Sequence, residues 1–470
     1  MQRTAVINVV GLTRGLIGRH TPHIDSFRKS GAIAHVRPPF PAVTCTSQSD
    51  YLTGVNASEH GIVANGWYNR EYAEVYFWKQ PDHLVQHPKI WDELRKRDPK
   101  FTCAKLFWWY NMYGNVDWSI TPRPLYPADG RKFFDIYSWP TGLGEEVKAE
   151  LGEFPFFGFW GPAAGVNSAK GKANCVSKWI ADAAKVVEDK HQPTLNLIYL
   201  PHLDYNLQRL GPEDSAISDD VEAIDMIVGG LISFFNKRNI HVVLLAEYGI
   251  TQVDTPIHIN RIFREQGWIT VREELGRELL DFGNSKVFAV ADHQVAHIYL
   301  NDRSLRKSVL SVLSTVPGID KVLAESEKLS SGISHPRAGD LIAVSKPNAW
   351  FTYYYWTEDS RAPDFATTVD IHRKPGYDPC ELFIDPKIGF PKLRIAKKLI
   401  QKKLGFRMLM DLIPLDADLV KGSHGACPEG EEHWPVVVTQ QHEYLPDNQI
   451  KSTDVYDIIK AQVLGEKLHR

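Results

Sequence analysis

Side chains that can act as nucleophiles cluster in the stretch PAVTCTSQSDYLTG, residues 41–54. A hydroxyl or thiol becomes a nucleophile when a neighbouring base or metal ion takes its proton. A reactive thiolate would need an activating histidine beside it, and a serine-hydrolase motif of the form G-x-S-x-G is absent from the stretch. The alternative is a purely structural role, in which these polar side chains mark the start of a helix. The candidate side chains are Thr44, Cys45, Thr46, Ser47 and Ser49.

Carboxylates and imidazoles follow several segments that read as buried strands. Such side chains, gathered at one edge of a sheet, are the ligands that zinc, manganese or iron prefer. Taken singly, each of them is equally explained as a cap or a hydrogen-bonding loop residue. Their co-occurrence favours a divalent metal site. The residues in question are His202, Asp204, Glu247, Asp292 and His293, and further along the chain Asp370, His372 and His424.

Short runs rich in β-branched residues alternate with longer amphipathic segments. The predicted strands are 4–10, 194–200, 240–247, 285–291 and 434–440, and the clearest predicted helices are 176–189 and 215–238. Buried strands that alternate with helices are typical of a parallel α/β sheet. Functional sites of such sheets lie beyond the carboxyl ends of the strands, which is where the polar residues above are placed.

Composition limits the class of protein. The chain has 470 residues and a formal net charge of −3, so the whole molecule is not attracted to nucleic acid or to anionic membranes, although residues 394–407 are locally basic. Five scattered cysteines predict reduced thiols rather than a disulfide framework. The N-terminus reads as a strand rather than a signal, and no transmembrane segment or nucleic-acid polymer partner is expected. A cytoplasmic location is the resulting expectation.

The segment from residue 41 to residue 65 resembles the alkaline phosphatase superfamily, and within it the type I phosphodiesterase/nucleotide pyrophosphatase family. The pieces are PAVT (41–44), LTG (52–54), SEHGI (58–62) and AN (64–65), and the match continues in DYNLQRLGP (204–212), EYGI (247–250) and GSHG (422–425). The resemblance implies Thr44 as nucleophile and Asn65 as phosphate ligand. It also implies Tyr199 and Cys45 beside the substrate.

The resemblance further implies a fold and a division of the chain. We expect an alkaline-phosphatase-like α/β core, with a mostly parallel central sheet and helices on both faces, from residues 1–265 and 420–470. An inserted cap region with additional strands would span 266–419. A segment rich in aromatic residues, 105–140, is expected to fold over the sheet and wall a pocket.

The metal ligands that the family motif requires are only partly present. Asp204 and His424 match, and Glu247 is a conservative replacement, but Val10, Gln208 and Tyr248 occupy expected ligand positions. One interpretation is a rebuilt set of ligands that also draws on other side chains, with His372 a rival to His424. These further candidates are His202, Asp292, His293, Asp370 and His372. The other is a fold that has lost one or all of its metals.

The first interpretation predicts a metal-dependent hydrolase of a small phosphodiester, phosphomonoester or pyrophosphate. Divalent metal ions, zinc first and manganese or iron as alternatives, would activate Thr44, which attacks phosphorus and forms a phospho-enzyme. Asn65 and the backbone N–H of Cys45 would stabilise the charge on the phosphoryl oxygens. The second interpretation predicts a catalytically altered or inactive member of the fold that binds a ligand or acts as a scaffold.

Overall fold

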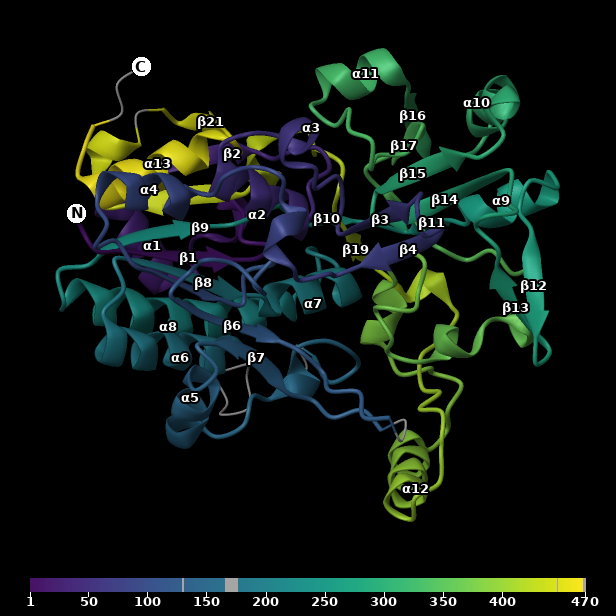
Figure 1. Ribbon diagram of the computed structural model, residues 1–470, viewed down its shortest axis with the longest axis horizontal. Coiled ribbons are helices and arrows are strands. Elements are labelled where there is room, and N and C mark those ends of the chain that lie inside the picture. Colours follow the sequence, from purple (N-terminus) through teal and green to yellow (C-terminus); the bar gives the residue numbers. More distant parts are fainter. Residues whose placement is uncertain (129–130, 165–175, 446, 468–470) are drawn as a thin grey trace.

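The large sheet of this protein has nine strands, most of them parallel. The structure is a computed structural model, and it describes residues 1–128, 131–164, 176–445 and 447–467 (Figure 1). In spatial order the strands are β21 (Gln449–Lys451), β2 (Ala32–Arg37), β20 (Val436–Thr439), β9 (His241–Leu245), β1 (Thr4–Val9), β8 (Leu195–Leu200), β5 (Cys103–Leu106), β6 (Trp118–Pro122) and β7 (Ile136–Trp139).

Helices cover both faces of this sheet (Figure 1), which confirms the predicted fold class. One face carries α1 (Pro22–Lys29), α6 (Val176–His191) and α8 (Ile217–Asn236), and the other α2 (Thr44–Thr53), α4 (Ile90–Arg97) and α13 (Asp454–Leu464). The central strands β1 and β8 are buried along their whole length, as expected for strands sandwiched between two helical layers. The sequence predictions for β1, β8, β9, β20, α6 and α8 are confirmed within one to three residues at most ends.

A second sheet of four antiparallel strands lies beside the first. It consists of β14 (Val287–Asp292), β15 (Val295–Leu300), β17 (Leu341–Ser345) and β16 (Ile319–Leu323). The prediction placed the strand at 285–291 in the parallel sheet, and this was wrong. A fully buried apolar run has the same pattern in either kind of sheet, so the sequence did not distinguish them.

The aromatic-rich segment 105–140 is also corrected. It was expected to fold over the sheet, but β6 and β7 form the edge of the nine-stranded sheet, where β6 pairs with β5 in parallel and with β7 antiparallel. The strands that carry the remaining small pairings are β3 (Gly66–Asn69), β4 (Glu74–Phe77), β10 (Thr251–Gln252), β11 (Thr255–Ile257), β12 (Val271–Glu274), β13 (Arg277–Leu280), β18 (Ala349–Phe351) and β19 (Gly422–Ser423).

The remaining helices connect these sheets or lie outside them. They are α3 (Ala57–His60), α5 (Leu143–Leu151), α7 (His202–Leu210), α9 (Ile259–Glu265), α10 (Arg306–Leu313), α11 (Glu325–Ser330) and α12 (Pro391–Lys403). Among the described residues, no helix has the length and apolar character needed to cross a bilayer. Cys45, Cys103, Cys380 and Cys427 are free thiols, and Cys175 lies outside the described residues.

Strand β19 passes very close to helix α7, and this approach sets the position of the residues around it. The backbone N–H of Lys421 donates to the carbonyl of Gln208 over 3.0 Å, and a Cβ on Gly422 would lie 1.9 Å from the carbonyl oxygen of Leu207. Only glycine therefore fits between the two backbones. The contact brings His424, two residues later, toward the residues on α7.

Replacement of Gly422 by alanine should lower the free energy of unfolding by about 2–3 kcal/mol, because β19 must move away from α7. Denaturant unfolding measures this loss. The matched control is Gly389→Ala, where the added Cβ meets no atom within 4 Å and stability should be unchanged. Equal stability of the two variants would contradict the packing described here.

Candidate active site

Thr44 is the first residue of helix α2, as predicted. The preceding residue, Val43, is extended, and every residue of α2 is buried, so the helix runs into the protein rather than along its surface. The Thr44 side chain is nearly inaccessible, at 3% exposure. Its Oγ1 lies 3.2 Å from the hydroxyl oxygen of Tyr248, and the Thr44 side chain also interacts with Tyr199 and Glu247.

Asn65 lies beside the start of α2, where the prediction placed it. Its Oδ1 accepts a hydrogen bond of 3.0 Å from the backbone N–H of Cys45, and its Nδ2 donates to Oδ1 of Asp292 over 3.2 Å. The Cys45 N–H was expected to face a phosphoryl group, and this is corrected, because it is bonded to Asn65. The Cys45 thiol is buried, and burial raises its pKa well above the ordinary value, which rules against a thiolate nucleophile.

Tyr248 links Thr44 to a buried carboxylate. The Tyr248 hydroxyl donates to Oδ1 of Asp204 over 3.1 Å, and the Gln208 amide donates to Oδ2 of the same carboxylate over 2.7 Å. The hydroxyl of Tyr377 in turn donates to Oε1 of Gln208 over 2.9 Å. Both oxygens of Asp204 therefore accept from protein groups. Sequence reasoning treated Tyr248 and Gln208 only as missing ligands and overlooked this role.

Glu247 follows strand β9 and is also held by amides. Its Oε1 accepts from the Asn8 side chain over 2.6 Å and from the Gln48 side chain. Asn8 lies on β1, two residues before Val10, which occupies the expected position of a metal-binding aspartate. Asn8 thus reaches the site as a hydrogen-bond donor to Glu247, a function that its spacing in the sequence did not reveal.

Four rings stack in a column next to Asp204. Tyr248 stacks on His424 with ring centroids 3.6 Å apart, His424 lies 3.8 Å from His293, and His293 lies 3.6 Å from Tyr377. Nδ1 of His424 lies 2.7 Å from the carbonyl oxygen of Ala42, which fixes Nδ1 as the protonated nitrogen. His293 pairs through its Nδ1 with Asp292 over 2.7 Å. The column fills the space between the two sheets.

The three buried carboxyl groups in this region hold their protons more strongly than usual. Burial raises the pKa of Asp204 to about 7, of Glu247 to about 8 and of Asp292 to about 6. Burial also lowers the pKa of His293 and His424 well below its ordinary value, so both imidazoles are neutral. Within the described part of the chain, no lysine or arginine forms an ion pair with these three acids.

These donors do not fit the predicted metal centre. Among the described residues, no three histidine, cysteine, aspartate or glutamate side chains converge as a metal site. His424 comes within 3.9 Å of Asp204, but both carboxylate oxygens already accept hydrogen bonds and the Tyr248 ring covers the imidazole. Oε1 of Glu247 accepts from two amides, and its Oε2 is buried without a hydrogen-bond partner among the described residues.

Two further predicted ligands lie elsewhere. Nδ1 of His372 lies 3.3 Å from the carbonyl oxygen of Phe77, and Asp370 packs near Glu381, which accepts its backbone N–H over 2.8 Å. Of the two rival late histidines, His424 is therefore the one in the site. His293 reaches the site from the second sheet, but it contributes to the ring column and not to a set of ligands.

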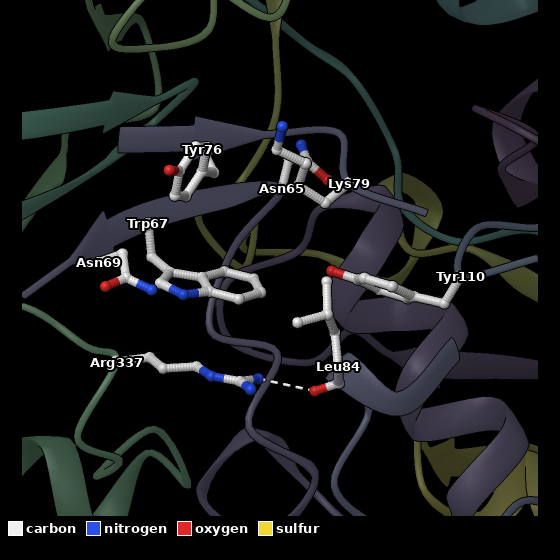
Figure 2. Close-up of a pocket in the computed structure, with 8 residues that line it drawn as sticks. All are labelled: Asn65, Trp67, Asn69, Tyr76, Lys79, Leu84, Tyr110 and Arg337. Atoms are coloured by element: carbon white, nitrogen blue, oxygen red, sulfur yellow. Dashed lines mark hydrogen bonds between the residues drawn. The ribbon is translucent and has the colours of Figure 1, made fainter. Parts of the chain in front are cut away.

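A cavity of about 100 Å³ opens beside Asn65 (Figure 2). Figure 2 shows the rings of Trp67 and Tyr110 directed toward one another across it, with Asn65 and Lys79 on one side and Arg337 on the other. Tyr110 also interacts with the Cys45 thiol, which connects the cavity to the start of α2. Tyr199, predicted to contact substrate, lies beside Thr44 and Glu247 and is buried to a similar degree as Thr44. The cavity is lined by Asn65, Trp67, Asn69, Tyr76, Lys79, Leu84, Tyr110 and Arg337.

Comparison of the sequence with known proteins identifies a matching family and a curated relative. The sequence model of the family described as "Type I phosphodiesterase / nucleotide pyrophosphatase" matches residues 4–378. An uncharacterized pyrophosphatase/phosphodiesterase of Schizosaccharomyces pombe is 24% identical over 238 residues, which cover 49% of this chain and 41% of that protein. The chain thus aligns with less than half the length of this curated relative.

Two solved structures share the fold over nearly the whole chain. Murine ectonucleotide pyrophosphatase/phosphodiesterase 5, in an inactive form in complex with AMP, aligns with a TM-score of 0.56 and 13% identity over 100% of this chain and 96% of its own. Phosphonoacetate hydrolase from Sinorhizobium meliloti aligns with a TM-score of 0.58 and 14% identity over 98% and 96%. At these identities the likeness shows the fold alone.

The buried Glu247 makes stability depend on pH. The folded state raises its pKa from 4.5 to about 8, so the folded chain keeps a proton that the unfolded chain has lost. The stability of the wild type therefore falls as the pH rises between these values. Glu247→Gln removes the ionisation and keeps the acceptor for Asn8. It should be more stable than the wild type by on the order of 4 kcal/mol at pH 8.

The difference should shrink toward zero near pH 5, as measured by denaturant unfolding at both values. Glu213→Gln, the same change at an exposed position, serves as the control and should have no such pH-dependent effect. A Glu247→Gln variant whose stability differs from the wild type equally at both pH values would show that the Glu247 proton is not the cause.

Proposed function

This chain belongs to the type I phosphodiesterase/nucleotide pyrophosphatase family, and we propose that it hydrolyses a phosphoester or pyrophosphate bond with Thr44 as the nucleophile. One observation carries the proposal. The Thr44 hydroxyl lies within hydrogen-bond reach of Tyr248, whose own hydroxyl donates to Asp204. This chain of three groups offers a path by which the Thr44 proton can leave.

The path gives a balanced first step. Oγ1 of Thr44 attacks phosphorus, its proton passes to the Tyr248 oxygen, and the Tyr248 proton passes to Asp204. The bond between phosphorus and the leaving oxygen breaks, and that oxygen departs with the bonding electrons and takes a proton from solvent. A water molecule then attacks phosphorus, the bond between phosphorus and Oγ1 breaks, and Oγ1 takes its proton back from Asp204 through Tyr248. One water proton stays on the phosphate product and the other goes to solvent.

Asp204 is suited to this task by its surroundings. Its pKa of about 7 lies near the pH at which most enzymes work, and a base of that strength can both accept and return a proton. The murine neighbour offers indirect support, because its inactive form is a threonine-to-alanine variant. The start of helix α2 adds the partial positive charge that favours a phosphoryl group beside Thr44.

The metal is the point on which this chain departs from its family. Members generally depend on divalent metal ions. Zinc, manganese or iron were predicted here. Among the described residues no three ligating side chains converge, and both oxygens of Asp204 accept hydrogen bonds, although Oε2 of Glu247 and Nε2 of His293 have no partner. The proposal therefore assigns the Thr44 proton to Tyr248 and Asp204 and gives no step to a metal.

The cavity beside Asn65 indicates what kind of substrate would suit the site. Trp67, Tyr76 and Tyr110 offer aromatic faces, and Lys79 and Arg337 offer positive charge. The Arg337 guanidinium lies 4.8 Å from the centre of the Trp67 ring, and the Lys79 ammonium 4.6 Å from that of Tyr76. A small ligand that combines an anionic group with a flat ring fits these contacts.

A second candidate function is ligand binding without turnover. It is favoured by the burial of Thr44 and by the bonded state of the groups that a metal would otherwise recruit. On this account the cavity still binds an anionic ligand, so AMP would stabilise the protein against heat, but no phosphoester would be cut.

The proton path predicts the effect of removing one hydroxyl. Tyr248→Phe keeps the ring on His424 and should lower kcat for a chromogenic phosphodiester by about 100-fold or more, whereas Thr44→Ala should abolish turnover. Tyr377→Phe is the matched control, because its hydroxyl reaches only Gln208, and its kcat should stay within a few-fold of the wild type.

The same assay with chelator-treated protein separates the candidates. The proposal expects turnover that survives removal of metal, with metal content well below one ion per chain. Turnover that disappears with chelator and returns with zinc would restore the metal-dependent mechanism. An absence of turnover, together with stabilisation by AMP, would favour the binding function.

A further inference from the structure

Helix α12 stands away from both sheets (Figure 1). It is a helix of 13 residues, Pro391–Lys403, and none of its residues is buried. The surrounding segment 390–407 contains seven lysine and arginine residues and no aspartate or glutamate, in a chain whose net charge is −3. So strong a local excess of positive charge on an unpacked helix calls for a partner outside the described chain.

One side of α12 is apolar and faces solvent. We call Leu393, Ala396, Ile400 and Leu404 the apolar stripe, because their spacing of three or four residues places them on one helical face. Leu393 is 70% exposed, Ile400 59% and Leu404 68%. Phe390 and Phe406 extend the stripe at either end and are 79% and 66% exposed. Isolated exposed leucines are ordinary, but a continuous row of them is not.

Positive charge borders the stripe on both sides. Within the described chain, Arg394 and Lys398 pair with Asp411, but Lys397 and Lys403, which flank the stripe, form no ion pair. Nor do Lys392, Lys402 and Arg407 within those residues. Such cations can lie over an apolar surface by their methylene stems and place their charges at its edge.

We propose that α12 docks this protein on a membrane surface that contains anionic lipids. The apolar stripe would enter the boundary between headgroups and acyl chains, and the flanking lysines would contact the lipid phosphates and carboxylates. At about 1.5 Å per residue the helix is roughly 20 Å long, too short to span a hydrocarbon core of about 30 Å. It therefore lies in the plane of the surface.

Other occupants fit less well. A nucleic acid would satisfy the charge, but it would leave the row of leucines and phenylalanines facing water. A second copy of the chain would cover the stripe, but it would bring seven like charges against seven more. Of these three partners, only an anionic lipid surface would both bury the apolar stripe and neutralise the cations that flank it. This inference does not rest on the proposed hydrolysis.

The test is sedimentation of the full chain with vesicles. Vesicles of phosphatidylcholine with about 30 mol% phosphatidylserine should retain the protein at least tenfold more strongly than phosphatidylcholine alone, and added salt should weaken retention. The variant Leu393→Ser/Ile400→Ser/Leu404→Ser should lose at least tenfold in binding. Since all three side chains are exposed, it should keep the wild-type thermal transition.

Leu275→Ser/Leu329→Ser removes exposed leucines from other surfaces and should bind as the wild type does. A wild-type protein that ignores both kinds of vesicle would overturn the proposal, as would a stripe variant that binds as tightly as the wild type. Binding to single-stranded RNA that the stripe variant retains in full would assign the helix to nucleic acid instead.

Discussion

A carboxyl group buried in a protein must be met by a cation, by hydrogen-bond donors or by a proton. The site of this protein depends on how that requirement is met for Asp204 and Glu247. Among the residues that the structure describes, no lysine or arginine pairs with them. Tyr248 and Gln208 donate to Asp204, and Asn8 and Gln48 donate to Glu247. Burial also raises the pKa of both carboxyl groups, which favours their protonated forms. These donors come from β1, from α2 and from the segments that follow β8 and β9.

The same requirement explains how Thr44 can retain a function in an altered site. Where a metal would take the Thr44 proton, the Tyr248 hydroxyl lies within hydrogen-bond reach, and it is already bonded to the Asp204 carboxylate. The ring column from Tyr248 to Tyr377 then serves as packing that fixes the Tyr248 hydroxyl. Thr44, which matches the family motif, and Tyr248, which departs from it, thus belong to the same hydrogen-bonded group.

Much of the fold and several residues of the site could be predicted from the sequence, because they depend on local sequence patterns. Helix α2 and the strands before Asp204 and Glu247 were correct, and the ends of β8 and β9 bring Asp204 and Glu247 close to Thr44. The predictions that failed concern features that depend on contacts between distant segments of the chain. Asp292 and His293 come from a second, antiparallel sheet, and segment 105–140 forms a sheet edge. The roles of Tyr248, Gln208 and Asn8 appear only when their partners are in place.

The central claim is that Thr44 attacks phosphorus without a metal, with its proton taken through Tyr248. The most direct measurement is mass spectrometry of metal-free protein quenched in acid after incubation with a phosphodiester. The account predicts a phosphoryl group on the peptide that contains Thr44, and a much smaller amount in Tyr248→Phe. Phosphorylation of Thr44 that occurs only after zinc or manganese is added, and equally in both proteins, would contradict it.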